Sequence, residues 1–147
     1  MSVLVDIAWP TVVKAAVQRA VREGVRKGVT LTSNQLSGSC LTQAVKTEVQ
    51  NNAMGVLNGS TGLGYIKVNY FAVPSPGSSA STTDISTQSN ADAPGNILQV
   101  SVQAFPVQPL MPILGLQGAA ASALSITVYS SDIIEPNNNP PCVGTAP

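Results

Sequence analysis

The sequence contains no histidine, few charged side chains and few aromatic ones. Histidine is the commonest general base and metal ligand near neutral pH, so its absence excludes Ser-His-Asp and Cys-His catalysis. Charged residues make up only 10% of the 147 residues, against about 25% in a typical soluble domain. Seven basic and seven acidic side chains cancel, which argues against nucleic acid as a partner because phosphate binding needs surplus Lys and Arg. These absences favour a structural or interaction protein that is not an enzyme and needs no cofactor or metal.

Only two cysteines occur, Cys40 and Cys142, and they form no CxxC pair. Two thiols without histidine or carboxylate help do not make a zinc site. Two interpretations remain, two free buried thiols or one disulfide that fastens the C-terminal tail to the body of the protein. We favour the disulfide, because residues 137–142 (NNNPPC) have no apolar periodicity to hold the tail in place. It implies an oxidising compartment.

Apolar periodicity predicts an α+β chain that begins with a long helix over residues 1–30. An apolar row and a row of small residues follow the i, i+4 spacing of a helix: Val13, Val17, Val21 and Val25, then Ala16, Ala20, Gly24 and Gly28. Small residues let another backbone approach closely. Five of the seven basic residues lie on the same helix, namely Lys14, Arg19, Arg22, Arg26 and Lys27. We divide the chain into this helix (1–30) and a head with a C-terminal tail (31–147).

The head is predicted to hold a second helix packed on a small antiparallel sheet. The helix covers residues 39–57 and ends in the turn-forming sequence at 58–62. Three stretches alternate apolar and polar residues, as strands with one buried face do: 66–71, 98–104 and 124–129. The polar segment 74–96 is either a mobile surface loop or a display site. Three prolines exclude 105–114 from a central strand, so it is predicted to be a hydrophobic crossover.

The first thirteen residues are apolar but are interrupted by Asp6 and Pro10. They are too short to span a bilayer, which needs about 20 apolar residues, and they lack the basic region of a signal peptide. The segment is either the start of an amphipathic helix or the end of a membrane helix whose beginning is absent from this chain. Trp9 followed by the basic cluster is typical of a membrane edge.

Three segments together resemble the TadE-like proteins, pseudopilins of bacterial tight-adherence pili. Residues 15–26 (AAVQRAVREGVR) resemble the family's A-x-R-E-G-x-R signature, which follows its membrane helix. Residues 100–110 (VSVQAFPVQPL) resemble its V-x-V-x-Y-x-x-x-P-L segment. Residues 124–132 (LSITVYSSD) with Glu135 are similar to its closing strand and acidic end. The chain is N-terminally short against that family, since Met1 falls where the middle of the membrane helix would be, and no processing site can be assigned.

The resemblance implies a pilin-like fold and an exported, non-enzymatic subunit of a surface appendage involved in pilus or filament assembly and adhesion. Such a subunit is extracellular, or anchored in the inner membrane facing the periplasm. It either polymerises with copies of itself or other pilin-like subunits, or acts as a tethered accessory factor that does not polymerise. A small periplasmic binding module is a further alternative, and membrane contact would occur through the N-terminal helix.

Nine residues of the first helix are predicted to contact other subunits: Leu4, Ile7, Trp9, Val13, Ala16, Val17, Ala20, Val21 and Gly24. The alternative is that this helix packs on its own head. The carboxylates Asp84, Asp92, Asp132 and Glu135 could serve acid–base chemistry or calcium binding, but they lack ligand-loop spacing and are expected to be solvated. The basic cluster could contact anionic lipids or be a solvated charged face with internal ion pairs.

Overall fold

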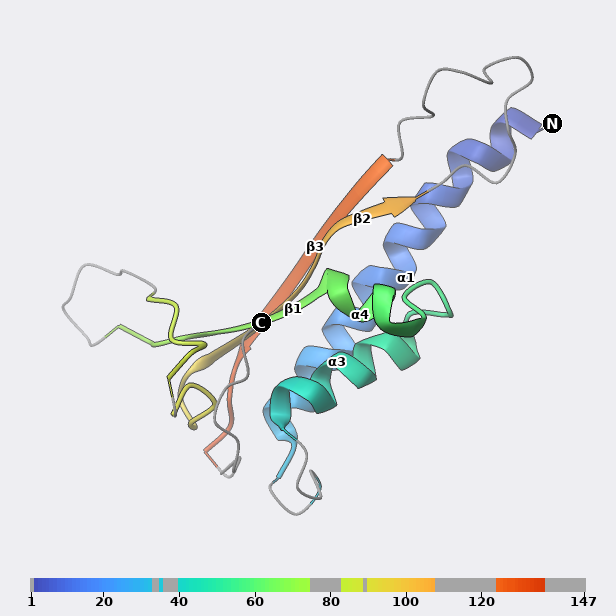
Figure 1. The fold of residues 1–147 in the computed structure, drawn as a ribbon. Helices are drawn as coiled ribbons and strands as arrows, with labels where there is room; N and C mark the ends of the chain where they lie inside the picture. The colour runs from blue at the N-terminus through green and yellow to red at the C-terminus, as the bar shows by residue number, and fades with distance from the viewer. Residues whose placement is uncertain are drawn as a thin grey trace.

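The structure, a computed structural model, describes residues 2–32, 35, 40–74, 83–88, 90–107 and 124–136, with side chains from residue 8 onward. In chain order its elements are α1 (Ser2–Thr30), α3 (Leu41–Asn52), α4 (Gly59–Tyr65), β1 (Ile66–Phe71), β2 (Ile97–Val107) and β3 (Leu124–Ile133) (Figure 1). The strands form one antiparallel sheet in the order β1-β2-β3. The predicted α+β class, the long first helix and all three strands are therefore confirmed.

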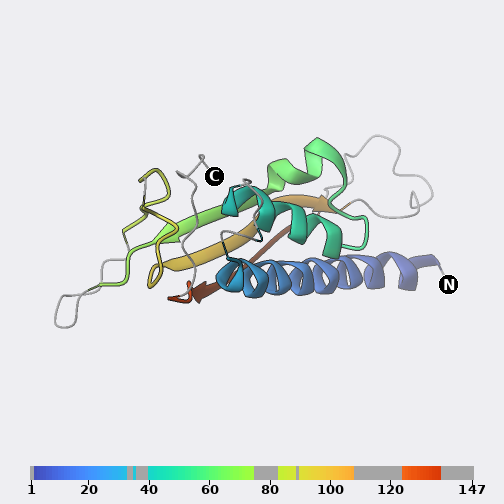
Figure 2. The same cartoon turned by 90° about the horizontal axis from the view of Figure 1, so that it is seen from below.

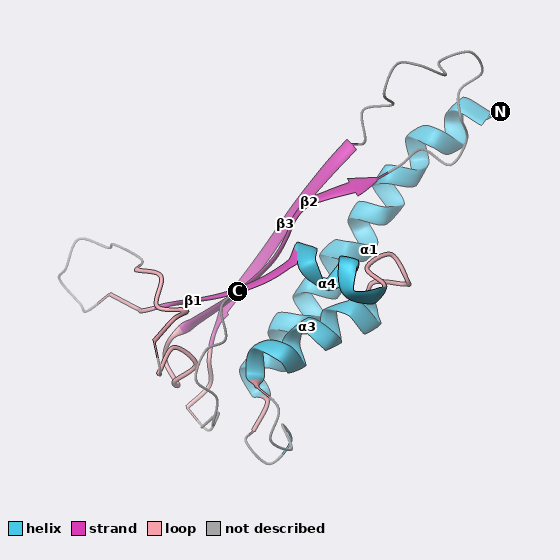
Figure 3. Ribbon diagram, viewed as in Figure 1, coloured by secondary structure: helices cyan, strands magenta, loops and turns pink. Residues whose placement is uncertain are grey.

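The helices form one layer and the sheet forms the other (Figure 3). α1 packs on α3, β2 and β3, whereas α3 packs on β1, and α4 packs on β1 and β2. Figure 2, seen from below, shows α4, α3 and α1 one beneath another in the helix layer. Alternate residues of the strands face the helices and are buried, as the period-2 pattern predicted: Ile66, Val68, Tyr70, Leu98, Val100, Val102, Ile126 and Val128.

The small-residue row of α1 is the surface on which α3 and the sheet approach it. A Cβ atom added at Gly28 would lie 2.6 Å from Leu98 Cδ2 and 2.7 Å from Val45 Cγ2. One added at Gly24 would overlap the side chain of Val49. Glycine costs about 1 kcal/mol against alanine within a helix, and here the close packing of α1 on α3 and β2 offsets that cost. From Val13 onward α1 is thus part of the same core as the head.

The second helix is shorter than predicted, because two residues in the left-handed region follow it. α3 ends at Asn52, and Met54 (φ 53°) and Gly55 (φ 81°) reverse the chain. The Gln50 amide then donates to the carbonyl oxygens of Leu57 (2.7 Å) and Gly59 (2.9 Å), which closes the turn. The predicted turn at 58–62 instead begins α4, a two-turn helix that the pattern of glycines did not indicate.

β2 continues to Val107, past the proline that was predicted to exclude this stretch from a central strand. The last pair between β1 and β2 is Ile66 with Val102, so beyond it β2 has β3 as its only neighbouring strand among the described residues. Pro106 pairs with Ser125 of β3, where the missing N–H costs no bond to β1. The register shifts between Val102 and Phe105, and Ala104 (φ 52°) lies in this bulge. Ala104 is therefore exposed, not buried as its alternation predicted.

The described part of the 74–96 segment is fastened to the end of the sheet. Ile85 is buried, and its N–H donates to the carbonyl oxygen of Tyr70 at 2.9 Å. The N–H of Ala72 donates to the carbonyl oxygen of Thr83 at 3.2 Å. Residues 83–88 and 90–96 thus extend the head at this end of the sheet. Residues 75–82 and 89 lie outside the described residues, so a mobile loop or a display site there stays a prediction.

Candidate subunit interface at the N-terminal end of the long helix

Six of the nine predicted interface residues lie in the chain's own core: Val13, Ala16, Val17, Ala20, Val21 and Gly24. The five side chains are at most 8% exposed, and Val17, Ala20 and Val21 are completely buried. Gly24 is buried as well. The apolar face of the sheet and the stripe of α3 already cover this face of α1, so it is not available to another subunit. This corrects the prediction for these six residues, for which the alternative, packing of the helix on its own head, is the observed arrangement.

The remaining three residues lie toward the start of α1. Trp9 is half-buried and packs against the edge of the core. Leu4 and Ile7 belong to the helix by their backbone, but their side chains lie outside the described residues. α1 extends through these turns beyond the ends of α3 and α4, as Figure 1 shows. Among the predicted interface residues whose side chains the structure describes, Trp9 is the one that is partly accessible.

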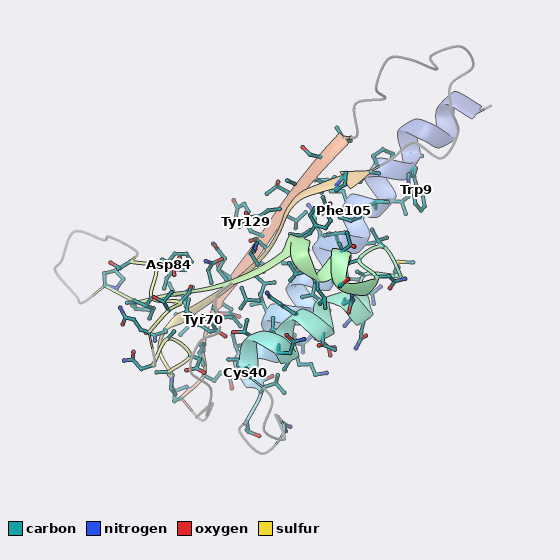
Figure 4. All side chains as sticks on the ribbon, in the orientation of Figure 1. Trp9, Cys40, Tyr70, Asp84, Phe105 and Tyr129 are labelled. Atoms are coloured by element: carbon teal, nitrogen blue, oxygen red, sulfur yellow. The ribbon has the colours of Figure 1, made fainter. Side chains whose placement is uncertain are left out.

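An apolar groove of about 270 Å³ lies beside Trp9. Its lining comes from α1, from the turn after α3 and from the end of β2: Trp9, Val13, Val56, Phe105, Pro106 and Val107. Phe105 is held in place by an edge-to-face contact with Tyr65, with ring centroids 5.3 Å apart. Trp9 and Phe105 lie at the same end of the molecule, well away from Asp84 and Tyr70 (Figure 4).

Two exposed large apolar side chains are close in sequence to residues that line this groove. Val12 of α1 is 53% exposed, and Met54 is 77% exposed in the turn that carries Val56. Exposed apolar side chains are unremarkable singly, but a cluster beside an apolar groove is typical of an interaction surface. We call this surface the apical patch and define it as Trp9, Val12, Met54, Val56, Phe105 and Pro106.

Residue spacing along the chain does not reveal most of the apical patch. Val56 follows Val49 and Ala53 at helical spacing, which favours the buried stripe of a helix, and no local pattern distinguishes Met54 or Val12 from their neighbours. The one available signal was the apolar, proline-rich stretch 105–114, which was expected to pack on the sheet or on a neighbour. Phe105 and Pro106 belong to it, and the rest of that stretch lies outside the described residues.

The basic residues of α1 are all exposed on the side of the helix that does not contact the core. Lys27 Nζ lies 2.5 Å from Glu48 Oε2 of α3, the one ion pair among the described residues. The hydrogen bond from Lys27 is the largest of the causes that lower the pKa of the Glu48 carboxyl. Among the described residues, Glu23 forms no ion pair with Arg19 or Lys27, its neighbours at i−4 and i+4, so the internal ion pairs considered for the basic cluster do not form.

The four carboxylates considered for catalysis or metal binding do not converge. Asp84 is exposed, as expected, and its pKa is lowered by hydrogen bonds from the hydroxyl and backbone N–H of Ser86 and from Asn69. Asp92 was expected to be solvated but is only 5% exposed, and burial raises its pKa. Asp132 and Glu135 are exposed near the end of β3. Within the described residues, no three His, Cys, Asp or Glu side chains lie close enough to share a metal ion.

Cys40 is the N-cap residue of α3, half-buried and with a free thiol in the part of the chain that the structure describes. Its predicted disulfide partner, Cys142, lies outside the described residues. The Cys40–Cys142 disulfide therefore stays a prediction.

No family model, curated protein or solved structure matches this chain. Among the helices of the described residues, none combines the length and the hydropathy needed to cross a bilayer.

Proposed function

We propose that this protein is a non-enzymatic structural subunit of an exported surface appendage, a TadE-like pseudopilin that takes part in pilus or filament assembly and adhesion. The observation that carries the proposal is the apical patch, where the half-buried Trp9 of α1 lies beside an apolar groove. The two-layer head built on the rest of that helix and the three motif segments add support. The proposed fold within the α+β class is pilin-like.

The apical patch sets how the subunit assembles. Copies of the chain, or other pilin-like subunits, contact one another through the first turns of α1 and the groove beside Trp9. The core-facing residues of α1 have a different role, since they hold the helix at a fixed angle on the head. Burying Trp9, Val12 and Met54 in a contact removes apolar surface from water, at roughly 25 cal/mol per Å².

A charge placed in the apical patch tests this mode of assembly. Val12→Glu and Met54→Glu alter exposed side chains, so the fold is expected to persist. Thr87→Glu adds the same charge to an exposed position of the 83–88 segment and serves as the matched control. We expect filaments containing the wild-type chain and the control in the sheared cell-surface fraction by electron microscopy, and none with either patch variant. Circular dichroism verifies that all four proteins are folded.

Other outcomes select among the alternatives. A membrane-bound species without filaments would indicate a tethered accessory factor and not a polymerising subunit. A soluble monomer that neither polymerises nor binds membranes, or filaments unaffected by both patch variants, would contradict assembly through the apical patch.

A further inference from the structure

β3 is an edge strand with a long open side. The sheet order β1-β2-β3 gives it one neighbour, and among the described residues no other strand pairs with it over Leu124–Ile133. Its side chains there include the exposed Ser125, Thr127 and Tyr129, the last 73% exposed. An edge of this length presents a row of backbone N–H and C=O groups that can pair with another extended chain.

A basic face of α1 runs beside this edge. Lys14, Gln18 and Arg22 line one groove with residues 127–129 of β3, with a volume of about 360 Å³. A second groove of about 470 Å³ continues it toward the start of β3, lined by Pro10, Thr11, Lys14 and residues 124–127. The two grooves share Lys14 and Thr127, so they form one channel along the strand. We call it the edge channel.

The charge in the edge channel is of one sign. Lys14 and Arg22 are its ionisable lining residues apart from Tyr129, and no acidic side chain lines it. Neither Lys14 nor Arg22 has an ion-pair partner among the residues that the structure describes. A ligand that pairs with the backbone of β3 would therefore meet two unpaired cations on the helix side.

We propose that the edge channel binds an extended acidic peptide segment of a partner protein, which adds to the sheet as a fourth strand beside β3. Main-chain hydrogen bonds to β3 supply affinity, and carboxylates facing Lys14 and Arg22 supply specificity, as in other cases of strand addition. The inference does not depend on the apical patch or on filament formation.

The spacing of the two cations defines the acidic motif. Lys14 and Arg22 are eight residues apart on α1, or about 12 Å at 1.5 Å per residue. β3 packs on α1, and the two run in a similar direction in Figure 1. Two strand residues four apart and on the same face are about 13 Å apart. The partner segment thus carries Asp or Glu at positions i and i+4, with a polar residue at i+2 opposite Gln18.

A second copy of this chain fits the channel poorly. Antiparallel pairing of β3 with β3 of another copy would place two rows of Lys14 and Arg22 next to each other, and like charges facing across a contact are destabilising. The other sheet edge, β1, carries Lys67 and offers no acidic row. The edge channel therefore selects a different, acidic chain.

The test measures binding of the full chain to an eight-residue peptide of alternating valine and polar residues, with glutamate at its second and sixth positions. The matched peptide has lysine at those positions. We expect the glutamate peptide to bind at least about tenfold more tightly. Lys14→Glu with Arg22→Glu should reverse this preference, whereas Arg19→Glu, exposed on α1 but outside the channel, should leave it unchanged.

A third peptide separates strand addition from charge attraction alone. N-methylation of alternate amides on the glutamate peptide removes main-chain donors while retaining its charge, so we expect binding to be lost. Equal affinity for the glutamate and lysine peptides, full binding of the methylated peptide, or no effect of the double charge reversal would overturn the proposal. So would channel-dependent binding of phosphatidylserine vesicles without peptide binding, or dimerisation of the wild type that the double variant abolishes.

Discussion

The hydroxyl oxygens of Thr42 and Tyr70 lie 3.0 Å apart inside the core, where they join α3 to β1. Both residues are almost completely buried. Each hydroxyl can donate or accept, so the pair satisfies two polar groups that water does not reach. The contact is thus a buried polar link between α3 and β1.

Tyr70→Phe should lower the free energy of unfolding by about 1–3 kcal/mol, because the buried Thr42 hydroxyl loses this partner. Chemical denaturation measures the loss, and Tyr129→Phe is the control, since the Tyr129 side chain is exposed. Thr42→Val combined with Tyr70→Phe should cost less than the sum of the two single variants. Strict additivity would show that the two hydroxyls are not coupled.

Gly28→Ala should destabilise the protein although alanine favours helix formation. The new methyl group would crowd Leu98 and Val45, and overpacking of this kind costs about 1–3 kcal/mol, more than the gain of about 1 kcal/mol in helix propensity. Gly64→Ala in α4 is the matched control, because nothing lies within 4 Å of its added Cβ. We expect a lower thermal midpoint for Gly28→Ala and an equal or higher one for Gly64→Ala. The reverse order would contradict the packing of α1.

Asp92 should make stability fall as pH rises. Burial raises its pKa in the folded state, so the folded protein binds this proton more tightly than the unfolded chain does. The free energy of unfolding therefore decreases as pH rises from the pKa of Asp92 in the unfolded chain, about 3.9, through its pKa in the folded protein. Asp92→Asn should be more stable than the wild type at neutral pH and equal to it below this range, as urea unfolding at several pH values would measure.

Asp84 provides the control of opposite sign. Hydrogen bonds from Ser86 lower its pKa, so its contribution is present above the unfolded pKa and is lost as pH falls through the folded pKa. Asp84→Asn should therefore be less stable than the wild type at neutral pH and equal to it in acid. If both asparagine variants change stability in the same direction, the two environments are wrongly assigned.

The Cys40–Cys142 disulfide remains a prediction that intact mass can test. The secreted, non-reduced chain should be two hydrogens lighter than the reduced chain, and Cys40→Ser should abolish the difference. On the chain-entropy model a bridge closing a loop of this length contributes about 4.7 kcal/mol, so reduction should lower the denaturation midpoint. A non-reduced chain with the mass of two thiols would leave Cys40 as a free cap of α3.

Much of the fold could be predicted from residue spacing. The i, i+4 rows of α1 and the alternation in Ile66–Phe71 gave the right elements, because one buried face imposes its own period on a helix or a strand. Local pattern failed where a few backbone angles decide the path of the chain. The reversal at Met54 and Gly55 shortens α3, and the bulge at Ala104 turns an alternating residue out to solvent.

The candidate site was the hardest part to predict. The apolar row of α1 suggested an interface, but the same row is what a helix needs to pack on its own sheet, and periodicity cannot distinguish the two partners. The apical patch combines Trp9, Met54 and Phe105, which are far apart in the chain. The edge channel likewise depends on α1 lying beside β3.

By itself the sequence determined the α+β class, the extent of the long helix, the strand faces outside the bulge at Ala104 and the absence of histidine chemistry, since each follows from residue types at short spacing. Only the tertiary structure decided that Val17 and Ala20 are core, that Asp92 is buried, and which side chains of α1 remain exposed. The physical reason is that burial depends on what packs against a face. At Gly24 and Gly28, α1 packs closely on Val49 and Leu98. These two residues lie outside α1 in the sequence, so no local pattern predicts that they meet it.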